Sequence, residues 1–233
     1  MHAIITGGTK GIGAAIAWRF AAEGFSLSLC ARTEADLKAF RESLLEAHPG
    51  IEVFVRPTDV RRKEEVQAFG KAALEALGPP EVLVNNAGIF LPGEIHREAE
   101  GTLEALLETN LYSAYHLTRR LLPAMLERRR GHIFNMCSVA SLFAYPNGGS
   151  YSISKFALLG FSKVLREELK DKGIRVTSIL PGATWSDSWK GADFPPDRLM
   201  PAEDIAAAVW NAYAMSPATV VEEILLRPQL GDL

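Results

Sequence analysis

The sequence predicts an α/β fold, a single domain built on a doubly wound parallel sheet with helices on both faces. Short apolar runs of β type alternate with longer segments of helical period along all 233 residues. The β-type runs are almost continuously hydrophobic, as expected for strands that are buried on both faces. Parallel strands need crossover helices, so strict alternation of the two kinds of segment favours a parallel sheet.

The elements follow one another without an internal repeat, linker or low-complexity tract, so residues 1–233 are expected to form one domain. Strands are predicted at residues 3–6, 26–31, 52–56, 82–85, 133–136, 175–180 and 220–226. Helices are predicted at residues 11–23, 34–47, 62–77, 102–129, 151–172 and 202–214, most of them ended by glycine or proline. Pro123 predicts a kink or a break inside the fourth helix.

Composition limits the class of protein. A hydrophobic content of 48% allows a substantial core, and a net charge of −3 offers no global basic field for nucleic acid. The one basic run, Arg128 to Arg130, is interpreted as a solvated helix end. No N-terminal signal segment and no stretch of about 18 uninterrupted apolar residues occurs, so we expect a cytoplasmic protein without a membrane partner.

The cysteines and histidines carry no metal-binding pattern. Cys30 and Cys137 lie in apolar strand-like runs and are expected to be reduced core thiols. The histidines are scattered without ligand spacing, at positions 2, 48, 96, 116 and 132. No metal site is therefore predicted.

A glycine-rich segment connects the first strand to the first helix. It reads Thr6-Gly7-Gly8-Thr9-Lys10-Gly11-Ile12-Gly13. Glycine allows backbone N–H groups to approach a pyrophosphate closely, and a helix N-terminus favours the anion. Six residues are predicted to bind a dinucleotide in a Rossmann-type fold, namely Gly7, Thr9, Lys10, Gly11, Ile12 and Gly13.

The end of the second strand indicates which dinucleotide binds. A carboxylate there would bond the ribose 2′-hydroxyl and repel a 2′-phosphate. This chain instead has Arg32 and Thr33 there, and Lys10 lies in the glycine loop. Two cations suit a phosphate, so NADP(H) is the predicted cofactor. Asp59, after the third strand, could accept a hydrogen bond from the adenine amino group or cap the next helix.

Tyr151 and Lys155 are the residues expected to move a proton. Their spacing places a phenol and an ammonium one turn apart on the same helix face. A neighbouring cation favours the phenolate, which suits the pair for acid/base chemistry.

By these motifs the chain resembles the short-chain dehydrogenase/reductase family over nearly its whole length. The matching motifs are Thr6-Gly7-x-x-x-Gly11-Ile12-Gly13, Asp59-Val60, Asn85-Asn86-Ala87-Gly88, Asn110, Ser138, Tyr151-x-x-x-Lys155 and Pro181-Gly182. They occur in the family's order, each after the expected strand or on the expected helix. The resemblance implies an NADP(H)-dependent oxidoreductase that interconverts a carbonyl and a secondary alcohol on a small or medium organic substrate.

The resemblance also implies a role for each residue. Tyr151 would be the general acid and base, and Lys155 would lower its pKa and hold the nicotinamide ribose. Ser138 would polarise the substrate oxygen, and Asn110 would hold a water that links Lys155 to solvent. Further cofactor contacts are implied for Val60, Asn86, Ala87, Gly88, Pro181, Gly182, Thr184 and Ser186. The family's threonine near the nicotinamide carboxamide is replaced by Ser186, with Thr184 nearby, and the choice between them stays open.

The family's substrate lid would span about residues 183–200, where Trp185, Trp189 and Phe194 predict an apolar or ring-stacking pocket. Length and C-terminal segment are similar to sepiapterin-reductase-like members, and reductases of 3-oxoacyl carrier protein are the other comparison within the family. A dinucleotide-sensing regulator without turnover is the alternative from another class. The family implies a homodimer or homotetramer formed through the two long helices.

Overall fold

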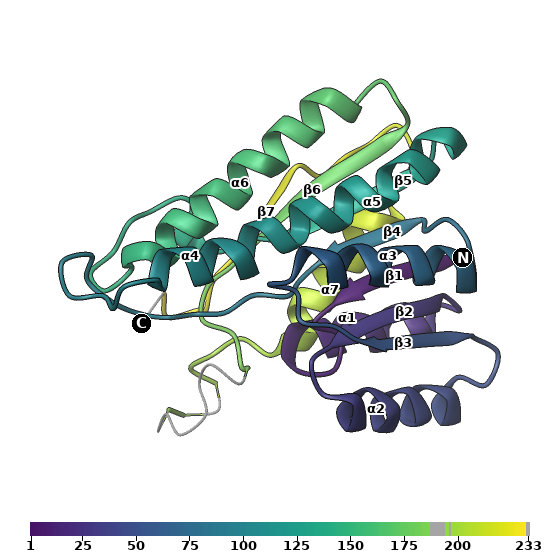
Figure 1. The fold of residues 1–233 in the computed structure, drawn as a ribbon, viewed down its shortest axis with the longest axis horizontal. Helices are drawn as coiled ribbons and strands as arrows, with labels where there is room; N and C mark the ends of the chain where they lie inside the picture. The colour runs from purple at the N-terminus through teal and green to yellow at the C-terminus, as the bar shows by residue number, and fades with distance from the viewer. Residues whose placement is uncertain (187–193, 196, 232–233) are drawn as a thin grey trace.

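The computed structural model describes residues 1–186, 194–195 and 197–231, and its centre is a seven-stranded parallel sheet (Figure 1). The strand order is β3-β2-β1-β4-β5-β6-β7. The strands are β1 (His2–Thr6), β2 (Ser26–Ala31), β3 (Val53–Pro57), β4 (Val82–Asn85), β5 (Gly131–Met136), β6 (Ile174–Pro181) and β7 (Glu223–Leu226). The order reverses between β1 and β4, which is the topological switch point of a doubly wound sheet. The predicted fold class is confirmed.

Helices cover both faces of the sheet. They are α1 (Gly11–Ala22), α2 (Glu34–Ala47), α3 (Lys63–Leu77), α4 (Thr102–Leu107), α5 (Ser113–Arg128), α6 (Gly149–Leu169) and α7 (Ala202–Ala214). On one face, α1, α2 and α7 bury residues such as Phe20 and Ile205 against the strands. On the other face, α3, α5 and α6 bury residues such as Phe69, Leu121 and Leu165.

The predicted break at Pro123 is wrong, and the alternative, a kink, stays a prediction. The helix α5 runs unbroken through Pro123, because Leu121 and Met125 on either side are fully buried and hold the helix in place. The interruption lies earlier, where a π-helix (Glu108–Tyr112) joins α4 to α5. Such π turns occur often at functional sites, and this one contains Asn110.

The basic run at the end of α5 is held by contacts rather than simply solvated. The carboxylate of Glu81 is largely buried and lies 2.9 Å from Arg130 and 3.9 Å from Arg128. Arg129 donates to the carbonyl oxygen of Asp171 at 2.9 Å. The three arginines therefore link the end of α5 to the segments just before β4 and β6, at the end of the sheet opposite the site residues.

Both cysteines, Cys30 and Cys137, are buried free thiols, as predicted. Within the described part of the chain, no group of three or more His, Cys, Asp or Glu side chains is placed to hold a metal ion. A search of the described helices finds none with both the length and the apolar character to cross a membrane.

Candidate active site and cofactor cleft

A cleft of about 1150 Å³ runs along the carboxyl ends of the strands, across the switch point between β1 and β4. The connections that follow β1 to β6 line it, so residues far apart in the sequence meet there. Open α/β sheets bind ligands at this position because the connecting loops on the two sides of the switch point run in opposite directions.

The glycine loop is packed directly against the segment that follows β4. The hydroxyl oxygen of Thr6 accepts hydrogen bonds from the N–H groups of Asn86 (3.0 Å) and Ala87 (2.9 Å). The Asn86 side chain donates back to the carbonyl oxygens of Thr6 and Gly7, at 2.9 and 3.2 Å. A Cβ on Gly13 would overlap the carbonyl oxygen of Gly7, so only glycine fits this crossing. Asn86 thus shapes the loop in addition to lining the cleft.

The start of α1 is suited to an anion. Its N-cap residue, Lys10, makes no side-chain cap bond, and a helix N-terminus offers backbone N–H groups to an anion. Gly7 and Gly11 have φ values of +63° and +52°, which turn the backbone toward the cleft. These features fit a pyrophosphate, as the sequence predicted.

Charged groups gather where β1 and β2 end. Lys10 and Arg32, which the sequence predicts to bind a 2′-phosphate, both line the cleft. The Lys10 ammonium also lies 2.7 Å from the Asp36 carboxylate, which the sequence interpretation did not consider. This carboxylate lowers the positive field that the two cations produce. Thr33 lines the cleft as well and is the N-cap residue of α2.

Asp59 lies after β3 and is bonded to its own loop. Its carboxylate accepts from the backbone N–H of Arg61 at 3.1 Å and from the Arg61 guanidinium, and this interaction lowers the Asp59 pKa. The helix α3 begins later, after Arg62 as its N-cap. Asp59 is therefore not the N-cap residue of α3, and with Val60 it lines the cleft.

Tyr151 and Ser138 meet at the middle of the cleft. Tyr151 lies in the first turn of α6, and Ser138 follows β5 and begins a short 3-10 helix, accepting a hydrogen bond from the Ala140 N–H at 3.1 Å. Burial raises the Tyr151 pKa, and a hydrogen bond with Ser138 partly offsets this rise. A phenol in this environment keeps its proton at neutral pH. Ser138 is thus placed beside the proton that Tyr151 would give up.

Burial, rather than Lys155, dominates the shift of the Tyr151 pKa. Its ammonium donates to the Met136 carbonyl oxygen at 2.8 Å and lies 5.8 Å from the centre of the Tyr151 ring. In the protein chain alone the net shift of the Tyr151 pKa is upward, because burial is its largest cause, and the lowering expected from Lys155 stays a prediction. Burial also lowers the Lys155 pKa to about 8.

Asn110 lies behind the cleft and connects two of its walls. Its carbonyl oxygen accepts from the Ile89 N–H at 2.8 Å, and its amide donates to the Ile89 carbonyl at 3.1 Å and to Ser154 at 2.9 Å. Ser154 in turn donates to the Tyr151 carbonyl oxygen at 2.7 Å. Asn110 therefore ties the segment after β4 to the helix that carries Tyr151 and Lys155.

The segment after β6 closes the far side of the cleft. Pro181, Gly182, Thr184 and Ser186 all line it. The Thr184 hydroxyl is buried and donates to the Gly182 carbonyl oxygen at 3.0 Å, whereas Ser186 lies over Gly11 of the glycine loop. The predicted lid lies only partly in the described structure: Trp189 and the other residues of 187–193 and 196 are outside the described residues.

The structure brings the predicted site residues together. All of them line the cleft except Gly13 and Asn110, which lie directly behind it. Sequence reasoning missed several cleft residues: Asp36, Arg61, Phe90, Phe143, Tyr145 and Arg227. Their positions after the ends of β2, β3, β4, β5 and β7, or early in the next helix, were the available signal, but they belong to none of the motifs.

The comparisons with known proteins agree with this geometry. A family model described as short chain dehydrogenase matches residues 1–193. Sepiapterin reductase of Chlorobaculum tepidum is 35% identical over 238 residues, which cover 99% of this chain and 97% of that protein. An NADP-dependent 3-hydroxy acid dehydrogenase of Salmonella typhimurium is 32% identical over 225 residues, covering 96% and 87%.

Solved structures show the same fold with the predicted cofactor. The alcohol dehydrogenase of Thermococcus sibiricus, complexed with 5-hydroxy-NADP, superposes with a TM-score of 0.90 at 29% identity, covering 98% of this chain and 96% of that one. Further similar structures contain NADP or NADPH. Together with the cofactor cleft, these matches show that the chain belongs to the short-chain dehydrogenase/reductase family and is an NADP-dependent oxidoreductase.

Proposed function

We propose that the protein interconverts a carbonyl and a secondary alcohol, with Tyr151 as the general acid for reduction and the general base for oxidation. The observation that carries this proposal is a partly buried phenol of raised pKa beside Ser138, in the same cleft as the glycine loop. NADPH, when bound, supplies the hydride. A donor that keeps its proton until the substrate oxygen becomes basic suits reduction.

Ser138 and Tyr151 would hold the substrate oxygen between them. Two hydroxyl groups at one point can donate to a carbonyl oxygen and stabilise the negative charge that develops on it. Tyr151 then gives its proton to that oxygen. The Ala140 N–H holds the Ser138 oxygen in place, so the group is oriented before the substrate arrives.

Lys155 and Asn110 would support the proton donor from behind. Lys155, fixed by the Met136 carbonyl, would bond the ribose hydroxyls of the cofactor and keep a positive charge near the phenol. Asn110 reaches the Tyr151 backbone through Ser154, so it would fix the position of the first turn of α6. A water held at Asn110 remains a proposal for the proton supply to Lys155.

The remaining cleft residues would bind NADP(H) from one end to the other. The pyrophosphate would lie on the glycine loop, formed by Gly7, Thr9, Lys10, Gly11, Ile12 and Gly13. Lys10, Arg32 and Thr33 would bind the 2′-phosphate, while Asp59 and Val60 would contact the adenine. Asn86, Ala87 and Gly88 would line the adenosine side, and Pro181, Gly182, Thr184 and Ser186 the nicotinamide side.

Replacing Tyr151 by Phe tests the mechanism. The variant removes one hydroxyl and keeps the ring, so NADPH binding should stay close to wild type while carbonyl reduction falls by about a thousandfold or more. Fluorescence titration measures the first quantity and NADPH absorbance the second. Wild-type turnover in this variant would disprove the role of Tyr151.

The whole of 1–233 would act as one dinucleotide-binding and catalytic domain, with residues 183–200 as a substrate lid. Retention of Asn110, Ser138, Tyr151 and Lys155 argues against a regulator that senses the dinucleotide without turnover. The full-length similarity to a sepiapterin reductase makes sepiapterin-type reduction the first substrate to test, and a 3-oxoacyl substrate the second.

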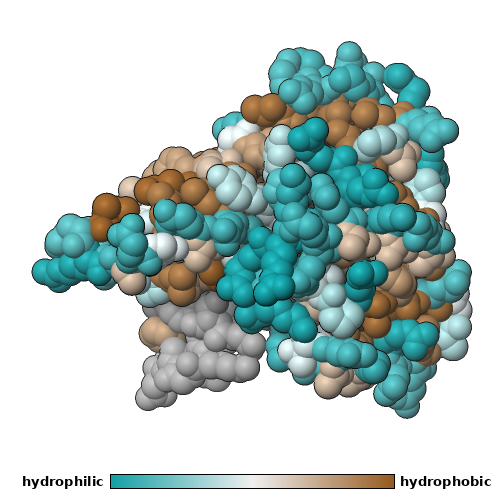
Figure 2. All heavy atoms as spheres, in the orientation of Figure 1, coloured by the Kyte–Doolittle hydropathy of each residue, from teal (hydrophilic) through white to brown (hydrophobic). Residues whose placement is uncertain are grey.

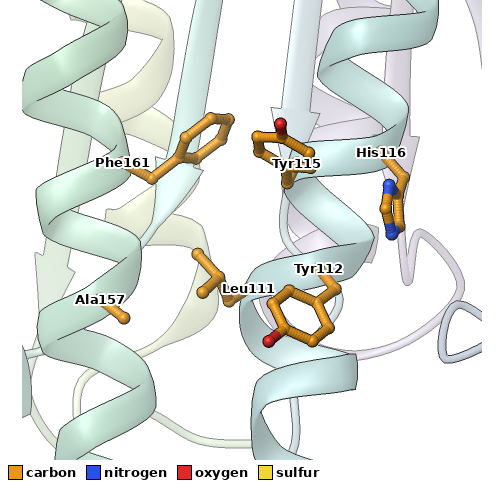
Figure 3. Close-up of a pocket in the computed structure, with 6 residues that line it drawn as sticks. All are labelled: Leu111, Tyr112, Tyr115, His116, Ala157 and Phe161. Atoms are coloured by element: carbon orange, nitrogen blue, oxygen red, sulfur yellow. The ribbon is translucent and has the colours of Figure 1, made fainter.

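A homodimer or homotetramer would form through α5 and α6. Between these helices lies an apolar depression of about 420 Å³, where Tyr115 and Phe161 face each other at 5.6 Å between ring centres (Figure 3). Hydrophobic residues gather on the face that includes α4, α5 and α6 (Figure 2). Light scattering should give a dimer or tetramer mass for the wild type and a monomer mass for Tyr115→Glu.

We also infer a cytoplasmic location from the two reduced thiols.

A further inference from the structure

One wall of the cleft consists of exposed and mostly aromatic side chains. Phe90 and Leu91 follow β4, and Phe143 and Tyr145 follow β5. Phe143 is 58% exposed, and the other three are between 36% and 40% exposed. Large apolar side chains are usually buried, and a cluster of exposed ones inside a cleft marks a surface that a ligand covers.

This aromatic wall reaches the proposed proton donor. The Phe90 and Tyr151 rings form an edge-to-face contact, with 4.8 Å between their centres and 82° between their planes. The two loops that form the wall also flank Ser138, because one of them contains it and the other lies on the neighbouring strand β4. The group attached to the substrate carbonyl would therefore lie against the wall while the oxygen faces Ser138 and Tyr151.

Charge is separated from the wall. The cleft-lining residues of these two loops, from Ile89 to Leu91 and from Val139 to Pro146, are all uncharged. Charged residues line the cleft after β1, β2 and β3, at Lys10, Arg32, Asp36, Asp59 and Arg61, and Lys155 lines it beside Tyr151. Arg227 lines the cleft from the end of β7 and is engaged in an interaction within the chain.

We infer that the substrate is a neutral ketone that carries an aromatic or heteroaromatic ring beside its carbonyl. This inference rests on the proposed function and specifies its substrate class. Edge and offset contacts between rings favour such a substrate over an aliphatic one of the same size. An anionic oxoacid would gain no cation from the wall and would lose hydration there.

The reaction balances with the groups already named. Hydride from NADPH forms the new C–H bond at the carbonyl carbon, and the proton of Tyr151 forms the new O–H bond. The products are the secondary alcohol and NADP⁺. Tyr151 recovers its proton from solvent.

Two substrates of similar size test the inference: acetophenone and cyclohexyl methyl ketone. We expect the wild-type kcat/KM to be roughly three- to tenfold higher for acetophenone, as one or two ring contacts imply. Phe143→Leu keeps an apolar side chain and removes the ring, so it should bring this ratio close to one while cyclohexyl methyl ketone is still reduced. Ile95→Ala, in the loop of Phe90 but outside the cleft lining, should leave the ratio unchanged.

Two further substrates separate this inference from the proposed function. Diacetyl is a small, activated carbonyl that does not need the wall, and acetoacetate is the anionic competitor. Reduction of diacetyl without any preference for acetophenone, or a preference for acetoacetate, would overturn the substrate class and leave the function intact. Failure to oxidise NADPH with any of the four substrates would overturn both.

Discussion

The carboxylate of Glu98 accepts hydrogen bonds from both the backbone N–H and the hydroxyl of Ser150, the residue before Tyr151. The N–H bond is 2.8 Å long, and the hydroxyl bond joins the second carboxylate oxygen. Glu98 belongs to the segment after β4, which also contributes Phe90 to the cleft. A negative group at the start of α6 complements the helix dipole. Glu98 therefore joins the aromatic wall to the helix that carries the proposed proton donor.

We expect Glu98→Gln to lower kcat about three- to tenfold, because a charge-assisted bond that holds the first turn of α6 is replaced by a neutral one. The dissociation constant of NADPH should stay within about twofold of wild type, since Glu98 lies outside the cofactor contacts. Steady-state kinetics and a fluorescence titration measure the two quantities.

Glu100→Gln is the matched control, because Glu100 is exposed in the same segment and should leave kcat unchanged. Equal losses of kcat and of NADPH affinity in Glu98→Gln would indicate general unfolding of the site and contradict a positioning role. An unchanged kcat would also contradict it.

The Glu98 contact shows what a single sequence conceals. The residues Pro146 to Gly149 have loop composition, so the sequence predicted that the helix starts at Tyr151. The structure starts α6 at Gly149, where the distant Glu98 binds the next N–H group. A partner 52 residues away cannot be found from local pattern alone.

The break predicted at Pro123 is absent for a related reason. A proline inside a helix is a strong local signal, but packing of α5 on the sheet outweighs the lost hydrogen bond at Pro123. The real irregularity surrounds Asn110, which must reach Ile89 and Ser154 at once. The ends of the strands, by contrast, were predictable, because burial on both faces makes the central strands β1, β4 and β5 largely apolar runs. The motif residues that follow these strand ends therefore line the cleft, as their positions in the sequence predicted.

The rate of reduction should depend on the charge of Lys155. Burial lowers the Lys155 pKa to about 8, so the ammonium is charged below that pH and loses its proton above it. We expect kcat/KM for reduction to be level toward neutral pH and to fall about tenfold for each unit above roughly pH 8. Lys155→Arg, whose guanidinium stays charged, should move this fall to higher pH even if its kcat is lower. A wild-type profile that stays level to about pH 10 would rule out this role.

The ion pair between Lys10 and Asp36 should limit the affinity for NADPH. Removing the negative charge with Asp36→Asn should tighten NADPH binding about two- to fivefold. The carboxylate repels the 2′-phosphate of NADPH, and water and salt at the surface weaken this repulsion. NADH lacks that phosphate, so its binding should change little. Arg32→Ala should weaken NADPH binding about tenfold and NADH binding much less.

Fluorescence titrations of both cofactors at low and high salt check this prediction. The gain in Asp36→Asn should shrink at high salt, as an electrostatic effect does. Parallel changes for NADPH and NADH would show that these residues do not read the 2′-phosphate.

The buried histidine His132 should make the fold sensitive to mild acid. Its Nε2 lies 2.7 Å from the Thr177 hydroxyl, which itself donates to the Val221 carbonyl, so Nε2 carries the proton. Its Nδ1 is buried and has no hydrogen-bond partner among the described residues. A proton on Nδ1 would be a buried, unsatisfied donor, and burial with the nearby Arg175 holds the His132 pKa well below its ordinary value.

The direction of the effect follows from the two states. In the unfolded chain His132 takes up a proton below about pH 6.5, whereas in the folded protein it stays neutral. The stability that neutral His132 contributes to the folded protein is therefore complete above that pH and is lost as the pH falls. We expect the free energy of unfolding to fall by about 1.4 kcal/mol for each pH unit below the unfolded pKa, in addition to any carboxylate effect. His132→Gln should remove that part of the slope in urea titrations between about pH 6.5 and 5.

A second variant, His2→Gln, should have a similar effect, because burial lowers the His2 pKa to about 4, and it replaces His132→Gln if that variant folds poorly. His96→Gln, on the exposed loop, should keep the wild-type slope, and equal slopes in all four proteins would exclude buried histidines as the cause.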